Sequence, residues 1–161
     1  MMKRILGWIM ALSLLMPLCA AAAEPASLPE EEYFALTEVG MQLWIPESLI
    51  SLSLTEEDRE DGYIAYFTSE DEAKALAVQA FAVGRVPLED YKSFVLEYDP
   101  EATIVTINGL RWLRYVQTEI DAVTYTYSDE NAYLLEITFA PVSDAEYADL
   151  AESIVASVRP L

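Results

Sequence analysis

Residues 132–158 limit the possible folds most, because they predict one β-strand followed directly by one amphipathic α-helix. The strand part alternates apolar and more polar side chains, with the period of two that a strand shows when one of its faces is buried. After Pro141, Ser143 and Glu146 match a Ser-x-x-Glu capping box, which predicts a helix that starts at Ser143. The apolar residues of this helix recur at helical spacing and are Tyr147, Ala151, Ile154, Val155 and Val158.

The remainder of the sequence predicts short strands joined by turns, with one further helix at residues 87–98. That helix has apolar side chains on one side and acidic side chains on the other. Asn108-Gly109 separates two alternating runs, and this dipeptide is the strongest short signal for a β-hairpin. The expected strands are residues 33–39, 41–45, 62–68, 75–83, 102–107, 110–118, 122–127 and 132–139, with residues 49–54 either a strand or irregular and residues 56–61 a charged turn.

These elements predict an α+β fold. Consecutive hairpins require an antiparallel sheet, and two amphipathic helices each need an apolar surface to cover. Residues 75–83 are apolar on both faces, which favours a central strand covered on both sides. We therefore expect an antiparallel β-sheet built from consecutive hairpins and covered by two amphipathic helices.

The first 23 residues predict a secretory signal peptide. Lys3 and Arg4 precede a short apolar run, and alanines at positions 20–23 supply a cleavage site between Ala23 and Glu24. The apolar run is shorter than the roughly 20 residues that a membrane span needs, so we expect no stable membrane insertion after cleavage. Residues 24–32 then form a flexible acidic leader, and residues 33–161 form a single domain that is secreted, held at the cell surface or periplasmic.

Cys19 raises the alternative of a bacterial lipoprotein, in which this cysteine carries the lipid. Leu18 is bulky for the position directly before a lipidated cysteine, and the alanines that follow favour ordinary cleavage. Cleavage after Ala23 removes the only cysteine of the chain. The mature domain would then have no disulfide, no thiol nucleophile and no thiolate ligand for a metal.

The charge of the chain narrows its possible partners. It has 28 acidic and 9 basic residues, a net charge of −19, and loss of the signal peptide with Lys3 and Arg4 makes it −21. Such a surface repels nucleic acid and anionic lipid and favours cations or a basic partner. Solubility outside the cell explains the same charge without any specific partner.

The residue types argue against most enzyme classes. The chain has no histidine, no Gly-x-Ser-x-Gly motif and no cluster among its five glycines. Ser-His and Cys-His catalysis, a nucleophile elbow and a glycine-rich phosphate loop are therefore excluded. A hydrolase that uses a pair of carboxylates stays open as an alternative, because its two acids need no fixed spacing in the sequence.

Calcium is the remaining candidate ligand, because it binds carboxylate and carbonyl oxygens. Residues 58–62 resemble a calcium loop only superficially, since they lack the Asp-x-Asp-x-Asp-Gly spacing and the distal glutamate. The acidic runs at residues 69–72 and 128–131 are typical of solvated hairpin turns. The metal-binding residues are therefore unknown, and a calcium-dependent adaptor stays an alternative.

Trp44 and Trp112 are the best candidates for contacts with a partner. Each lies on a strand face that mixes apolar and polar residues, and an exposed aromatic ring can stack on a sugar or anchor a protein. The alternative is that the aromatic residues fill the interface between sheet and helices, since such residues are enriched in strands. The partner itself, protein or carbohydrate, is not identified by the sequence.

Four segments together resemble PsbP-like and DcrB-like domains. They are Gly40 to Pro46, Pro87 to Phe94, Ile107-Asn108-Gly109, and Ile154 to Val158 at the end of the last helix. The resemblance covers nearly all of the mature chain, and it implies a PsbP-like sandwich in a protein that is exported or scaffold-like and generally not catalytic. The photosystem subunit that gives the fold its name has metal-linked roles, but no metal or partner residue of that subunit matches here.

The sequence thus predicts an exported, acidic, non-enzymatic binding or interaction domain without a cofactor.

The signal peptide gives a direct prediction. We expect the exported protein to begin at Glu24, because cleavage follows the last alanine of the run. Intact-mass analysis and N-terminal sequencing of the exported chain measure this. A Cys19→Ser variant serves as the control and should be exported and cleaved like the wild type. A lipid-modified N-terminus at Cys19 would contradict the prediction.

Overall fold

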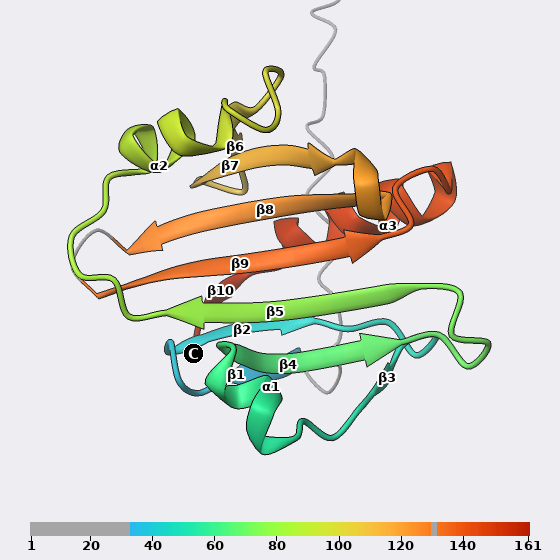
Figure 1. The fold of residues 1–161 in the computed structure, drawn as a ribbon. Helices are drawn as coiled ribbons and strands as arrows, with labels where there is room; N and C mark the ends of the chain where they lie inside the picture. Colours follow the sequence, from blue (N-terminus) through green and yellow to red (C-terminus); the bar gives the residue numbers. More distant parts are fainter. Residues whose placement is uncertain (1–32, 130–131) are drawn as a thin grey trace, which may run out of the picture.

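The computed structural model describes residues 33–129 and 132–161, in which two antiparallel β-sheets and three α-helices form (Figure 1). The predicted signal peptide and acidic leader, residues 1–32, lie outside the described residues. The strands are β1 (Tyr33–Leu36), β2 (Met41–Trp44), β3 (Ile50–Ser51), β4 (Tyr63–Thr68), β5 (Ala75–Phe81), β6 (Thr103–Ile107), β7 (Leu110–Gln117), β8 (Ala122–Asp129), β9 (Tyr133–Ala140) and β10 (Arg159–Pro160). The helices are α1 (Glu56–Glu60), α2 (Leu88–Val95), α3 (Ala145–Ala156) and the short 3₁₀ helix η2 (Thr118–Ile120).

The large sheet has seven strands in the order β3-β4-β5-β9-β8-β7-β6, all paired antiparallel. The runs β3-β4-β5 and β6-β7-β8-β9 each pair strand by strand as consecutive hairpins, as the alternating patterns predicted, and β5 pairs with β9 to join the two runs. At the β6–β7 turn, Asn108 and Gly109 have φ of 47° and 80°, the left-handed values that a tight hairpin turn requires. The predicted α+β class and the Asn-Gly hairpin are confirmed.

A second, three-stranded sheet in the order β1-β2-β10 was not predicted. Its third strand comes from the end of the chain, where Arg159 pairs with Gln42. The Arg159 guanidinium also lies 3.9 Å from the centre of the Tyr33 ring, and the Leu161 N–H donates to the Gly40 carbonyl at 3.0 Å. The single-sheet expectation was wrong here, because a two-residue strand that pairs with a partner far away in the sequence has no periodicity of its own.

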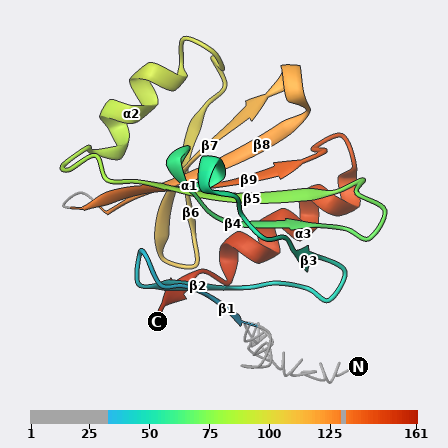
Figure 2. The ribbon, with the colours of Figure 1, turned by 60° about the horizontal axis from the view of Figure 1, so that its bottom comes forward.

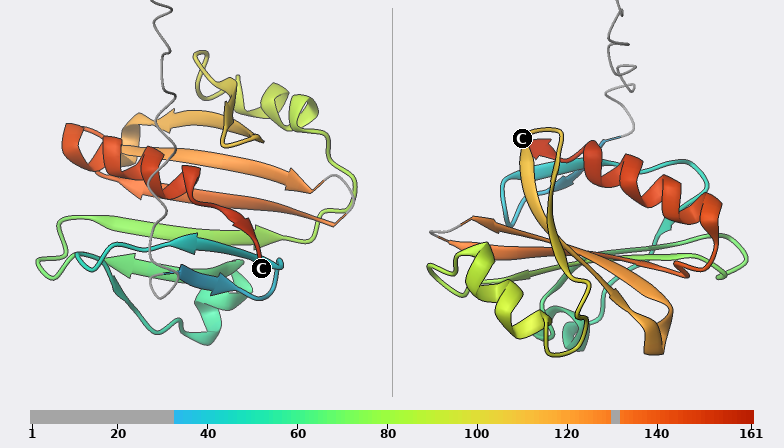
Figure 3. Two further views of the ribbon diagram at one scale, coloured as in Figure 1. Left: turned by 180° about the vertical axis from the view of Figure 1, so that it is seen from behind. Right: turned by 90° about the horizontal axis from the view of Figure 1, so that it is seen from above.

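Helix α3 and the small sheet lie side by side on one face of the large sheet (Figure 3). The main core forms between these layers. Its fully buried large side chains include Leu36, Leu43, Phe67, Leu76, Tyr125, Leu135, Ile137, Phe139, Tyr147 and Ile154. On β9 these are the alternate residues Leu135, Ile137 and Phe139, as the period of two requires.

The start of α3 differs by one residue from the prediction. Asp144, not Ser143, is the N-cap, and its carboxylate accepts a hydrogen bond from the Tyr147 N–H at 3.1 Å. Ser143 instead donates its hydroxyl and its N–H to the Asp121 carboxylate. Lys74 forms an ion pair with Asp144 at 3.2 Å, which favours the aspartate at this position.

Helix α2 lies on the opposite face of the large sheet and packs mainly on β6 and β7 (Figures 2 and 3). Leu88 and Val95 of α2 form a small second core with Ala102 and Leu113. The outer face of β5 is therefore partly exposed at Ala75, Ala77 and Phe81. Residues 75–81 form a central strand between β4 and β9, as expected. The expected cover on both faces is incomplete, because α2 packs mainly on β6 and β7 at the other end of the sheet.

Trp112 is completely buried, with an exposed fraction of 0 %. It lies on the face of β7 that points to the main core, where its ring centre is 5.7 Å from that of Tyr127. The expectation of a partner contact at Trp112 is therefore wrong, and the alternative of an interface-filling aromatic holds for this residue. Trp44 is half-buried, and its backbone N–H donates to Ser157 Oγ at 2.8 Å. Its contact with a partner stays a prediction.

Burial of Trp112 predicts a large loss of stability on truncation. We expect Trp112→Ala to lower the free energy of unfolding by about 3–5 kcal/mol, since it leaves a cavity in the core. Trp112→Phe should cost less, because among the described residues the buried indole N–H has no hydrogen-bond partner to lose. Urea unfolding measures both variants. Unchanged stability in Trp112→Ala would contradict the core position.

Candidate functional site

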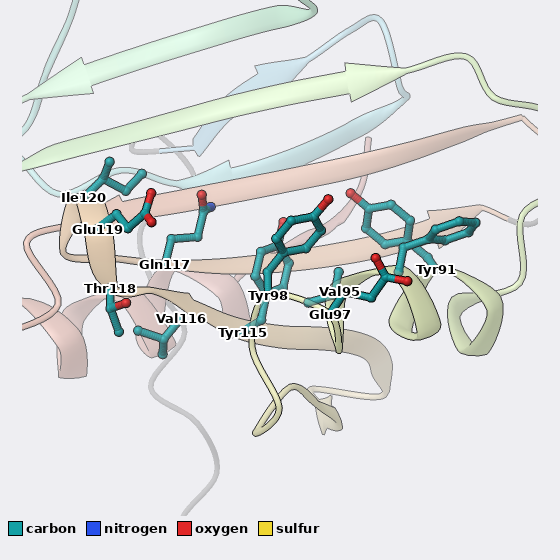
Figure 4. A pocket seen from close by; sticks show the side chains of 11 residues that line it. Tyr91, Val95, Glu97, Tyr98, Tyr115, Val116, Gln117, Thr118, Glu119 and Ile120 are labelled. Atoms are coloured by element: carbon teal, nitrogen blue, oxygen red, sulfur yellow. The ribbon is translucent and has the colours of Figure 1, made fainter.

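A groove of about 580 Å³ opens between the C-terminal end of α2 and the end of β7 (Figure 4). The α2 side and the loop after it contribute Tyr91, Phe94, Val95, Glu97 and Tyr98, and the β7–η2 side contributes Tyr115, Val116, Gln117, Thr118, Glu119 and Ile120. Its volume falls in the usual range of ligand sites. The sequence did not predict this site, because its two sides come from segments that only the fold brings together.

Asp99 fixes the loop that forms one wall of the groove. Its Oδ2 accepts a hydrogen bond from the Val116 N–H at 2.8 Å, and its Oδ1 accepts one from the Glu101 N–H at 2.9 Å. The last β6–β7 pair is Thr103 with Arg114, so Val116 lies beyond the reach of β6. The Asp99 carboxylate takes the place of the missing strand and holds the loop against β7.

Large apolar side chains stand exposed around the groove. Phe94 is 65 %, Tyr98 is 85 % and Ile120 is 60 % exposed, although a folded chain usually covers such residues when it can. All three line the same groove. Apolar groups that converge on one concavity are a usual mark of an interaction surface.

The side chain of Glu136 lies beside this groove, between the sheet and α2, and only 9 % of the residue is exposed. Its Oε1 accepts hydrogen bonds from the hydroxyls of Tyr91 at 2.7 Å, Thr126 at 3.1 Å and Tyr115 at 3.4 Å. These donors come from α2, β8 and β7, whereas Glu136 belongs to β9. One buried carboxylate therefore ties α2 to three strands of the sheet.

A second set of hydrogen bonds continues along the same sheet face. Gln117 Nε2 donates to Thr124 Oγ1 at 2.9 Å, and Thr124 Oγ1 lies 2.9 Å from Thr138 Oγ1. Thr124 and Thr126 are fully buried, so these contacts satisfy hydroxyls that would otherwise lose their water. The sheet face beneath α2 thus combines an apolar patch with a polar, internally satisfied strip.

Both tyrosines that meet Glu136 remain protonated at neutral pH. Burial, followed by the nearby Glu136 carboxylate, raises the pKa of Tyr115 to about 12 and raises the pKa of Tyr91 well above its ordinary value. Both effects disfavour a tyrosinate. The two hydroxyls are therefore fixed as hydrogen-bond donors and not as bases at neutral pH.

Among the residues that the structure describes, carboxylates but no cations line the groove. Glu97 lies on the α2 side and Glu119 lies at the other end next to Ile120 (Figure 4). None of the described lining residues is basic. Two carboxylates among aromatic rings give the groove a negative potential, to which the net charge of the chain adds.

The acidic loops considered for calcium hold their carboxylates in local hydrogen bonds. Asp58 belongs to the capping box of α1, where its Oδ2 accepts from the N–H and the hydroxyl of Thr55, each at 2.7 Å. These bonds lower the pKa of Asp58. Asp71 similarly accepts from Ser69 and Ala73 within its turn. Within residues 33–129 and 132–161, no group of three or more metal-ligating side chains comes together.

No protein-family profile matches this sequence, and no curated protein sequence is significantly similar to it. The structure, however, resembles solved structures of low sequence identity. It superimposes on the solution structure of cyanobacterial PsbP (CyanoP) from Synechocystis sp. PCC 6803 with a TM-score of 0.55 and 13 % identity, over 80 % of this chain and 91 % of that one. It superimposes on a crystal structure from Bacteroides thetaiotaomicron VPI-5482 with a TM-score of 0.54 and 14 % identity, over 81 % of this chain and 48 % of that one.

The protein is therefore an α+β protein with antiparallel sheets. More particularly, it has the PsbP-like fold, as the four sequence segments predicted. At this level of identity the likeness concerns the fold alone. In the described part of the chain, none of the helices has the length and apolar character that a membrane crossing needs.

Glu136 gives a prediction for the site. We expect Glu136→Ala to lower the free energy of unfolding by about 2–3 kcal/mol, because it leaves buried hydroxyl donors without their acceptor. Thr126→Val removes one donor and should cost about 1 kcal/mol. Urea unfolding at neutral pH measures both.

The exposed rim residue Glu119 is the matched control. Glu119→Ala should change stability by less than about 0.5 kcal/mol, as is usual for surface positions. Equal effects of Glu119→Ala and Glu136→Ala would contradict the anchoring role of Glu136.

Proposed function

We propose that this chain is an exported, non-enzymatic binding domain whose partner site is the groove beside α2. One observation carries the proposal: Phe94, Tyr98 and Ile120 are large, exposed apolar residues, and all three line that groove. These side chains stay exposed after the chain folds. Their burial by a partner would therefore stabilise the complex.

The arrangement beside the groove supports binding more than catalysis. Glu136 is buried and accepts three hydroxyl hydrogen bonds, so this carboxylate is engaged in holding α2. Tyr91 and Tyr115 are fixed as donors by the same contact. Without histidine or a cysteine in the mature chain, Ser-His and Cys-His pairs cannot form.

In this proposal the two longer helices have different roles. α3 covers one face of the large sheet and completes the core, while α2 covers part of the other face and forms one side of the groove. The predicted signal peptide supports export, which would bring the groove into contact with secreted, cell-surface or periplasmic partners.

Binding at the groove is tested with small aromatic and aliphatic fragments and the ¹⁵N-labelled full chain in NMR. We expect fragments to shift amide signals of residues 91–98 and 115–120 first. Tyr98→Ala should weaken their binding by about fivefold or more, as is typical of a central aromatic contact. Leu52→Ala, at an exposed apolar residue outside the groove, is the matched control and should leave binding unchanged.

Two results would contradict the proposal. Fragments that prefer another surface would remove the groove as the partner site. Turnover of chromogenic glycosides or esters that is abolished by Glu97→Gln or Glu119→Gln would favour the carboxylate-based hydrolase instead.

A further inference from the structure

We infer that the occupant of the groove is a basic segment of a partner protein, which places a lysine or arginine side chain among the aromatic rings and between Glu97 and Glu119. The inference rests on the proposed function and specifies the chemistry of the partner.

Charge complementarity is the first argument. Both titratable carboxylates of the rim, Glu97 and Glu119, are exposed, and no described basic side chain lines the groove. α2 carries one basic residue, Lys92, which does not line it. Elsewhere in the domain, Arg111 forms an ion pair with Glu89, and Lys74 forms one with Asp144. The rim carboxylates therefore favour a cation that comes from a partner.

The aromatic lining is the second argument. Four aromatic residues line the groove: Tyr91, Phe94, Tyr98 and Tyr115. A cation that lies over such a ring is attracted by its negative face. This chain uses the same contact twice elsewhere, since Arg159 lies 3.9 Å from the ring centre of Tyr33 and Lys74 lies 5.4 Å from that of Tyr147. Lysine and arginine also bring an apolar stem, which suits Ile120 and Phe94.

The exposure of the rings favours a protein segment over a free amine. Tyr98 is 85 % and Phe94 65 % exposed, so they project well beyond the floor of the groove. A small amine within the groove would leave most of this surface in water. A segment that continues across both rings would bury it, and burial of apolar area is what supplies affinity. Nucleic acid and anionic membranes are disfavoured by repulsion from a chain of net charge −19.

Three peptides of equal length test the inference with the full chain by isothermal titration calorimetry. In the first peptide arginine and lysine alternate with leucine and tryptophan; in the second glutamine replaces each basic residue, and in the third glutamate does. We expect the basic peptide to bind about tenfold more tightly than the glutamine peptide, the glutamate peptide to bind least, and added salt to reduce the difference. Hexylamine, the free-amine probe, should bind more weakly than the basic peptide.

Variants test whether the preference for the basic peptide depends on Glu97 and Glu119. The double variant Glu97→Gln/Glu119→Gln should weaken the basic peptide about five- to tenfold and leave the glutamine peptide unchanged. Glu47→Gln/Glu152→Gln changes the net charge equally at exposed residues outside the groove, and it should have less than about a twofold effect. Circular dichroism and thermal unfolding confirm that each variant is folded.

The outcomes separate this inference from the proposed function. If basic and glutamine peptides bind equally and Tyr98→Ala weakens both, the groove binds a partner but the cationic preference is overturned. If both double variants weaken the basic peptide equally, the attraction is general to the acidic surface and the inference is also overturned. If hexylamine competes as well as the basic peptide, the occupant is a free amine. If no peptide binds, the inference fails, and the fragment experiment alone decides whether the groove binds a partner.

Discussion

The structure depends on β9, which pairs with β5 on one side and with β8 on the other. One face of this strand forms part of the main core, and the opposite face holds α2. Leu135, Ile137 and Phe139 point to the main core and pack with α3 and the small sheet. Glu136, between them in the sequence, points to the other face and receives the hydroxyl of Tyr91 from α2. A shift of one residue in the register would exchange the two sets, so the pairing that builds the core also places the carboxylate that holds α2.

The two faces of the large sheet differ in what stabilises them. The face that carries α3 has the larger apolar core, whereas the cluster beneath α2 holds four buried apolar residues among those that the structure describes. Hydrogen bonds to Glu136 and the Asp99 contact with Val116 supplement this small cluster. Hydrogen bonds are directional and apolar contacts are not, so these polar contacts fix the orientation of α2 and of the loop after it. The groove takes its shape from that orientation.

Local sequence patterns predicted the strands and helices. The groove could not be predicted in this way, because segments that are distant in the sequence form it. The hairpins and α3 follow from periodicity and turn residues, as Asn108-Gly109 shows. The pattern also placed Trp112 on one face with Val116, but which face is buried depends on where α3 packs, and that is not local. Glu136 with Thr126 and Thr138 looks like a solvated strand face until α2 covers part of it. The N-cap of α3 is Asp144 and not the predicted Ser143, because Ser143 forms a hydrogen bond with Asp121, which is distant in the sequence.

Electrostatic attraction and apolar contact act on a partner at different distances from the groove. At physiological ionic strength a charge is screened beyond about 8 Å, so the net charge of the chain speeds encounter with a basic partner but does not select the groove. Selection needs groups in direct contact, and among the carboxylates that the structure describes only Glu97 and Glu119 line the groove. Exposed carboxylates contribute little affinity on their own, since water solvates them well. Affinity must then come from covering Phe94, Tyr98 and Ile120, while the two glutamates decide which apolar partner is accepted.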